Sequence, residues 1–173
     1  YYLVDMGKNN DPKLALAVDY LEYLGTDKYS LEELNKEFYK LGSKYYVYTS
    51  ENQVYVRLTG LQSSFDASIS LFEHVLNNPK GDEEALKNMI AGEMKYRSDN
   101  KLDKQNVLYS GLYNYAMYGP KNPFNNVLTN EQLNSITVEE MIALIKSVMS
   151  FEHNVLYYGP SEMKDIETMI AEK

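Results

Sequence analysis

Two neighbouring segments near the middle of the chain have the side-chain period of a β-strand. Residues 44–50 are rich in tyrosine and valine, and in residues 53–60 apolar side chains alternate with polar or amphipathic ones. This period of two places alternate side chains on opposite faces of a sheet. Only two polar residues separate the segments, so they predict a β-hairpin. Because much of the remaining chain has a helical period, the hairpin restricts the fold to helices combined with an antiparallel or mixed sheet.

Helical segments lie on both sides of this hairpin. Apolar residues recur every three or four positions over 14–24, where Gly25 is expected to cap the helix end. Ser30 and Glu33 have the spacing of a capping box, which predicts a second helix that stops at Gly42. Further helices are predicted at 64–76, 82–98, 103–118, 137–150 (opened by a Thr137–Glu140 capping box) and 162–171, strands at 1–6 and 154–158, and a turn at 122–124.

Composition narrows the class of protein further. The 173 residues suffice for one domain with a substantial core, and no linker or internal repeat interrupts them. The formal net charge of −8 argues against nucleic acid and against an anionic membrane as partners. The absence of cysteine excludes disulfides and thiolate metal sites. No apolar run approaches the ~20 residues of a membrane span, no signal peptide is recognised, and the compartment stays undetermined.

One short segment carries a family resemblance. Gly25 and Thr26, followed by Lys28, Tyr29 and Ser30, match the residues that follow the active-site helix in pitrilysin/insulinase-family zinc metallopeptidases. Four other patterns resemble landmarks of that family in the same order, over residues 3–159. These are residues 3–7, Tyr48-Thr49-Ser50, residues 76–79, and residues 118–124 with Leu128, Ile136-Thr137 and Tyr157-Tyr158-Gly159.

The helix before Gly25 lacks the residues that this family uses for catalysis. Its active members have the motif His-x-x-Glu-His, whose positions correspond here to Leu16, Asp19 and Tyr20. A catalytic zinc site needs imidazole or carboxylate ligands and a position for water. The chain has only two histidines, His74 and His153, so a displaced motif is excluded. We therefore expect no catalytic residue and no metal site in this chain.

Acidic residues downstream are candidates for the family's last zinc ligand. Asp82, Glu83 and Glu84 lie at the start of a predicted helix. Acids in a first helical turn stabilise the helix dipole, and we expect these three to be solvated charges rather than ligands. Similarly, Glu73 and His74 are adjacent in a helix and point about 100° apart, so we expect an ordinary surface or half-buried histidine rather than a general-base pair.

The resemblance implies an α+β domain of the mitochondrial-processing-peptidase-like metallohydrolase type. Members of the family pair such domains into two halves that enclose a chamber, and one half holds the zinc motif. This chain resembles a domain of the other half, so residues 1–173 are expected to be one non-catalytic domain excised from a longer multi-domain chain. The implied partners are the catalytic half, or a paired subunit, and peptide substrates. Zinc is expected only in the catalytic half of the parent protein.

Tyrosine is the residue type most suggestive of peptide contacts. The chain has 17 tyrosines, which offer contact area at low rotamer entropy. Most are expected to fill half-buried positions in strands and helices. Tyr45, Tyr46, Tyr48 and Tyr55 are the candidates for peptide binding, since they crowd one hairpin. If its first strand is an edge, a peptide could pair with it by β-augmentation.

Two other functions remain open at this point. A scaffold or assembly module of the same fold, without peptidase activity, would share every feature described so far. An independent enzyme with an unrecognised mechanism is a third alternative, although the sequence contains no nucleophile elbow, phosphate-binding loop or dinucleotide-binding motif. A His-x-x-Glu-His helix upstream in the full-length gene would favour the peptidase, and its absence would favour the scaffold.

Overall fold

A computed structural model gives the fold of residues 1–122 and 125–171. Its main sheet has four antiparallel strands in the order β3-β4-β1-β6. These are β1 (Tyr2–Val4), β3 (Lys44–Thr49), β4 (Val54–Thr59) and β6 (His153–Val155). The predicted hairpin is therefore confirmed, with Val47 opposite Val56. The sheet is wholly antiparallel, and β3 and β6 form its two edges.

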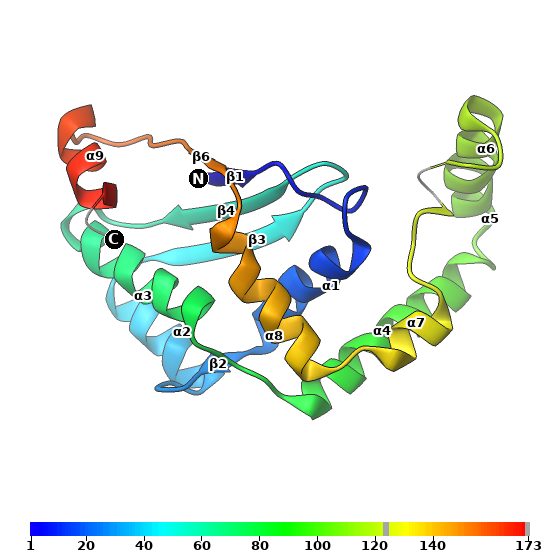
Figure 1. The fold of residues 1–173 in the computed structure, drawn as a ribbon, viewed down its shortest axis with the longest axis horizontal. Coiled ribbons are helices and arrows are strands. Elements are labelled where there is room, and N and C mark those ends of the chain that lie inside the picture. Colours follow the sequence, from blue (N-terminus) through cyan, green and yellow to red (C-terminus); the bar gives the residue numbers. More distant parts are fainter. Residues whose placement is uncertain (123–124, 172–173) are drawn as a thin grey trace.

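Helices cover one face of this sheet (Figure 1). They are α1 (Pro12–Tyr20), α2 (Leu31–Lys40), α3 (Phe65–Asn77) and α8 (Val138–Ser147). The sheet face that they cover carries Val4, Val47, Val54 and Val56, all nearly inaccessible to solvent. The core between the layers is completed by large residues of the helices, including Leu14, Val18, Leu34, Phe38, Phe72, Met141 and Ile145. The predicted α+β architecture, a sheet covered by helices, is confirmed.

The remaining helices extend from this body. Helix α4 (Glu83–Asn100) leads to α5 (Lys104–Asn106), a π-helical turn (Val107–Leu112) and α6 (Tyr113–Tyr118), and the chain returns through α7 (Asn130–Ser135). In Figure 1, α5 and α6 stand apart from the sheet, while α9 (Met163–Ala171) lies at the opposite end of the molecule. None of the helices in these described ranges is long and apolar enough to cross a membrane.

Local sequence signals placed several helix ends correctly. Ser30 and Glu33 form both arms of the capping box that starts α2. Gly42 and Gly119 adopt positive φ angles of 59° and 72° after α2 and α6, a conformation that costs glycine little. Thr137 caps α8 by accepting from the Glu140 amide, but the carboxylate of Glu140 instead binds Lys13 of α1, so it ties two helices together.

Three features differ from the sequence prediction. Gly25 does not cap α1, which ends at Tyr20 and continues as a 3-10 turn, Leu21–Tyr23. Instead Gly25 lies in a short strand, β2 (Gly25–Thr26), paired with β5 (Pro79–Lys80). A Cβ atom at Gly25 would lie 2.4 Å from the Tyr29 carbonyl oxygen, so close backbone approach explains the glycine. Helix α7 and the β2–β5 pair were not predicted. Part of the predicted 122–124 turn lies outside the described residues.

Candidate functional site

The three positions that correspond to the zinc motif lie on α1 and serve different purposes. Leu16 is half-buried, Asp19 reaches solvent, and Tyr20 is 0% exposed. Partial desolvation raises the pKa of the Asp19 carboxyl, and nearby Lys8 opposes that effect. Leucine offers no ligand atom, so these three side chains do not form a set that binds zinc in the usual tetrahedral manner.

Tyr20 connects α1 to the start of α4. Its hydroxyl donates a hydrogen bond to the Asp82 carbonyl oxygen and accepts one from the Asp82 amide at 2.8 Å. Asp82 is itself the N-cap of α4, since its carboxylate accepts from the Ala85 amide at 2.9 Å. Burial raises the pKa of the Tyr20 hydroxyl above its ordinary value. Tyr20, at the position that corresponds to the motif's second histidine, therefore links α1 to α4.

A groove of about 780 Å³ runs between α1 and α4. Leu16 and Asp19 contribute one wall, and Asn88 and Glu93 are among the α4 residues that contribute the other. Glu93 pairs with Arg97 one turn away, with 2.6 Å between Oε1 and Nε. Within the described ranges, no cluster of three or more His, Cys, Asp or Glu side chains could hold a metal ion.

Glu93 is the α4 carboxylate that sequence reasoning missed. Asp82, Glu83 and Glu84 occupy the cap and first turn of α4 and are exposed, as predicted for solvated helix-terminal charges. Glu93, two turns further along, is close enough to Asp19 to disfavour ionisation of its carboxyl. The i,i+4 spacing of Glu93 and Arg97 was visible in the sequence, but it predicts an ion pair on any helix surface and does not single out the groove.

The four hairpin tyrosines fall on two faces of the sheet. Tyr45 points toward the helices, with its ring centroid 4.9 Å from that of Phe38 and 5.1 Å from that of Phe72. Burial raises the pKa of Tyr45 to about 12. The other three share the opposite face of the sheet, turned away from α1, α2, α3 and α8, since side chains alternate along β3 and Tyr48 pairs with Tyr55. The rings of these two stack in parallel at 4.8 Å.

A second groove borders the edge strand β3, which carries Tyr45, Tyr46 and Tyr48. Its volume is about 740 Å³, and residues 44–47 of β3 line it together with α2 residues such as Asn35 and Tyr39. Tyr46 is 49% exposed and Tyr48 48% exposed, so both can contact a bound molecule. Only one side of β3 is paired in the sheet. An edge strand has backbone donors and acceptors available for an added strand.

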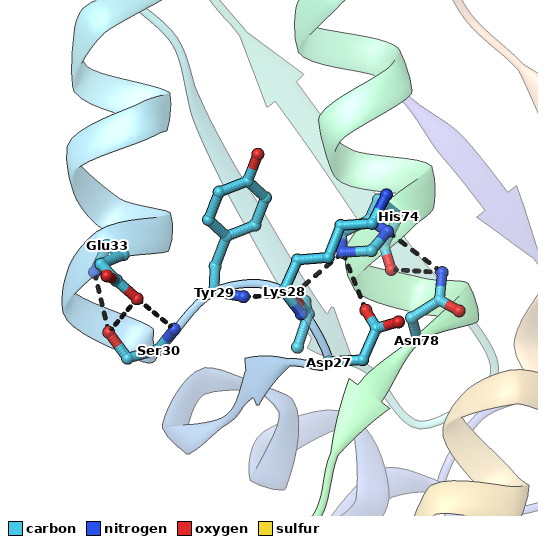
Figure 2. A network of polar contacts seen from close by, with 8 residues as sticks. Asp27, Lys28, Tyr29, Ser30, Glu33, His74 and Asn78 are labelled. Atoms are coloured by element: carbon cyan, nitrogen blue, oxygen red, sulfur yellow. Dashed lines mark hydrogen bonds and ion pairs between the residues drawn. The ribbon is translucent and has the colours of Figure 1, made fainter.

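His74 belongs to a network that holds the β2–β5 pair against α3 (Figure 2). Its Nε2 lies 3.0 Å from Thr26 Oγ1 and 3.2 Å from Asp27 Oδ1, and its Nδ1 lies 3.1 Å from the side-chain amide of Asn78. The Tyr29 ring meets the imidazole edge-on at 6.0 Å. His74 therefore has a structural position, as predicted, and the segments that carried the family resemblance are in contact through it.

Comparison with known proteins identifies the fold. No family model and no curated protein matches this sequence. Among solved structures, the periplasmic protease PqqL from Escherichia coli matches 98% of the chain with a TM-score of 0.78 at 11% identity. A protease from Helicobacter pylori matches 99% with a TM-score of 0.74 at 18% identity. The inactive domain of a peptidase M16 from Pseudomonas fluorescens matches 83% with a TM-score of 0.67 at 14% identity.

The matched regions are parts of longer chains. The match covers 19% of PqqL, 42% of the H. pylori protease and 36% of the P. fluorescens protein. At these identities the similarity concerns the arrangement of helices and strands. The resemblance carried by Gly25, Thr26 and the later landmarks agrees with it at the level of fold. The chain has the α+β fold of a pitrilysin-like, M16-type peptidase domain.

Proposed function

We propose that this chain is a catalytically silent domain of a zinc-dependent metalloendopeptidase, excised from a longer chain. In this proposal it forms part of the wall of a peptide-binding chamber and contacts the peptide, while zinc and the catalytic residues belong to another domain or to a paired subunit. The alternative is a scaffold of the same fold in a protein without peptidase activity.

The observation that carries the proposal is the changed use of the motif positions on α1. A tyrosine whose hydroxyl makes two hydrogen bonds to Asp82 fixes α1 against α4, and a leucine occupies the first position. These residues stabilise the packing of the two helices while offering no zinc ligand set. The groove between α1 and α4 lies beside them and is lined in part by Asp19 and Glu93. This combination supports a domain that keeps the shape of a peptidase domain without its chemistry.

Peptide contact is supported by the edge strand β3. A peptide extended along this strand could satisfy the free backbone groups of β3, and its side chains could enter the adjoining 740 Å³ groove. Tyr46 and Tyr48 would contact the face of the peptide that is turned away from the helices. Because backbone pairing does not depend on side-chain identity, we expect broad rather than sequence-specific recognition.

The decisive experiment measures zinc content and peptide hydrolysis for this chain alone and for the full-length gene product. We expect the chain alone to be metal-free and inert, and the full-length protein to hold zinc and cleave peptides. Zinc in neither protein would refute the peptidase proposal and favour the scaffold. Hydrolysis by the metal-stripped chain alone would refute catalytic silence.

Binding of an unstructured model peptide tests the contact surface separately. The double variant Tyr46→Ala/Tyr48→Ala should weaken binding to the chain by roughly tenfold, as for loss of about 1–2 kcal/mol of aromatic contact. Tyr158→Ala is a matched control, since Tyr158 is fully exposed and lies outside the groove. Methylation of alternate backbone nitrogens of the peptide should also weaken binding. If both variants bind the peptide as tightly as the unmodified chain does, the Tyr46 and Tyr48 surface is not the peptide-binding surface.

A further inference from the structure

The segment 102–118, which we call the arm, exposes apolar side chains along its whole length. It contains α5, the π-helical turn and α6, and stands away from the body of the domain (Figure 1). No residue from 101 to 121 is buried. Nine of its large side chains are between 48% and 82% exposed: Leu102, Val107, Leu108, Tyr109, Leu112, Tyr113, Tyr115, Met117 and Tyr118.

The arm also lacks the polar surface of a solvated helix. Its two charged residues, Asp103 and Lys104, are at its base, and residues 105–118 contain none. Two of its polar side chains are used internally: the Asn106 amide donates to the Asn100 carbonyl and the Asn114 amide to the Ser110 carbonyl. What remains for a partner is therefore mainly apolar, with tyrosine hydroxyls. Charge depletion with aromatic and methionine enrichment is typical of the core of a protein interface.

The exposed area is large enough for a stable interface. A fully exposed aromatic side chain presents about 200 Å² and an aliphatic one somewhat less, so the arm exposes on the order of 1,000 Å² of apolar surface. The largest apolar patch on a typical monomer is about 300–600 Å². A standard protein interface buries about 800 Å² on each partner. The arm therefore exceeds ordinary surface hydrophobicity and matches one side of an interface.

The base of the arm is fixed to the body. Arg97, in the last turns of α4, donates through Nη1 to the Leu128 carbonyl on the returning segment. Asn126, on the same segment, donates to the Lys8 carbonyl at 3.4 Å. The first bond joins α4 to the returning segment, and the second joins the returning segment to the loop before α1. At the start of the arm, the Asn106 side chain is bonded to the last residue of α4.

Exposure on all sides of the arm indicates the shape of its partner. Val107 and Tyr109, two positions apart in the π-helical turn, point to roughly opposite sides of it and are both at least half exposed. A second identical arm laid alongside would cover only one side, and two copies that each carry a net charge of −8 repel one another. An interfacial membrane helix needs a polar, cationic face, which residues 105–118 lack. A concave apolar protein surface satisfies all these conditions.

We infer that the arm docks into a concave, charge-poor apolar surface of a neighbouring domain in the same polypeptide. This inference rests on the proposed function, in which the chain is one domain of several. It agrees with the matched solved structures, whose chains extend well beyond the matched region. The arm would then fix the position of this domain against its neighbour, and with it the position of the β3 edge.

Amide hydrogen exchange tests the docking directly. Exchange across the arm is measured in the 173-residue chain and in the full-length gene product. We expect at least about tenfold slower exchange of the arm in the full-length protein. The double variant Leu108→Lys/Leu112→Glu places opposite charges one turn apart, so it should not repel within the helix, and it should abolish the added protection. Met163→Glu replaces another exposed apolar side chain by a charge, on α9, and should leave the protection intact.

Three outcomes would overturn the inference. The first is equal exchange of the arm in both proteins. The second is protection of the arm in the 173-residue chain that rises with its concentration, which would indicate a second copy as the partner. The third is protection that appears only when lipid vesicles are present. Because the altered side chains are exposed, both variants should unfold at the same temperature as the unmodified chain. Zinc and hydrolysis measurements keep the two proposals apart: an active peptidase with an unprotected arm refutes only the docking, and a protected arm without zinc refutes only the peptidase.

Discussion

Replacement of Tyr20 by phenylalanine removes a single oxygen atom and tests the tether between α1 and α4. The hydroxyl makes two hydrogen bonds with the backbone of Asp82 in a side chain that is 0% exposed. Each such bond contributes about 1 kcal/mol net, and a backbone group left without a partner adds to the cost. We expect the free energy of unfolding to fall by about 2 kcal/mol. For a domain of this size the midpoint should fall by about 4–8 °C.

The assay is chemical and thermal unfolding of the chain, followed by circular dichroism. Tyr39→Phe is the control, because Tyr39 is 85% exposed and its replacement should change stability by less than about 0.5 kcal/mol. Amides in the first turn of α4 should also exchange faster in Tyr20→Phe. A Tyr20→Phe protein as stable as the control, with unchanged exchange in α4, would refute the structural role assigned to the Tyr20 hydroxyl.

Three further predictions concern single residues. Gly25→Ala should lower the free energy of unfolding by about 1–3 kcal/mol in chemical unfolding, since the new Cβ meets the Tyr29 carbonyl. Gly92→Ala should raise the free energy of unfolding by about 0.5–1 kcal/mol, because nothing lies near its Cβ and alanine is the better helix former. His74→Ala should cost about 1–3 kcal/mol in the same assay, because it removes the hydrogen bonds that the imidazole shares with the Thr26 hydroxyl and the Asn78 amide. Burial raises the pKa of Tyr45 in the folded chain from 10.0 to about 12. The neutral Tyr45 hydroxyl therefore contributes its full stabilisation below pH 10, and this stabilisation is lost as the pH rises to 12. The Tyr45→Phe variant should lack this loss, so its free energy of unfolding should decline by roughly 2–3 kcal/mol less over the same pH range.

Sequence reasoning located the candidate sites better than it described them. The motif positions on α1 and the hairpin tyrosines were identified from local pattern alone. The sequence did not show that Tyr20 contacts Asp82, because that contact joins residues 62 positions apart. Nor did it separate Tyr45 from Tyr46 and Tyr48, since strand alternation gives two faces without saying which one the helices cover. Glu93 was missed for the same reason: helix spacing does not report which neighbour a helix face meets.

Local interactions determined some features of this fold, and long-range packing determined the others. Hydrophobic period, capping boxes and turn glycines act within a few residues, so the sequence alone determined the hairpin, most helices and the glycine turn that follows α2. The tertiary structure decided the strand order that makes β3 an edge, the pairing of Gly25 with Lys80, and the isolation of the arm. Each of these depends on which distant segments come together, and that choice is made by burial of apolar surface across the whole domain.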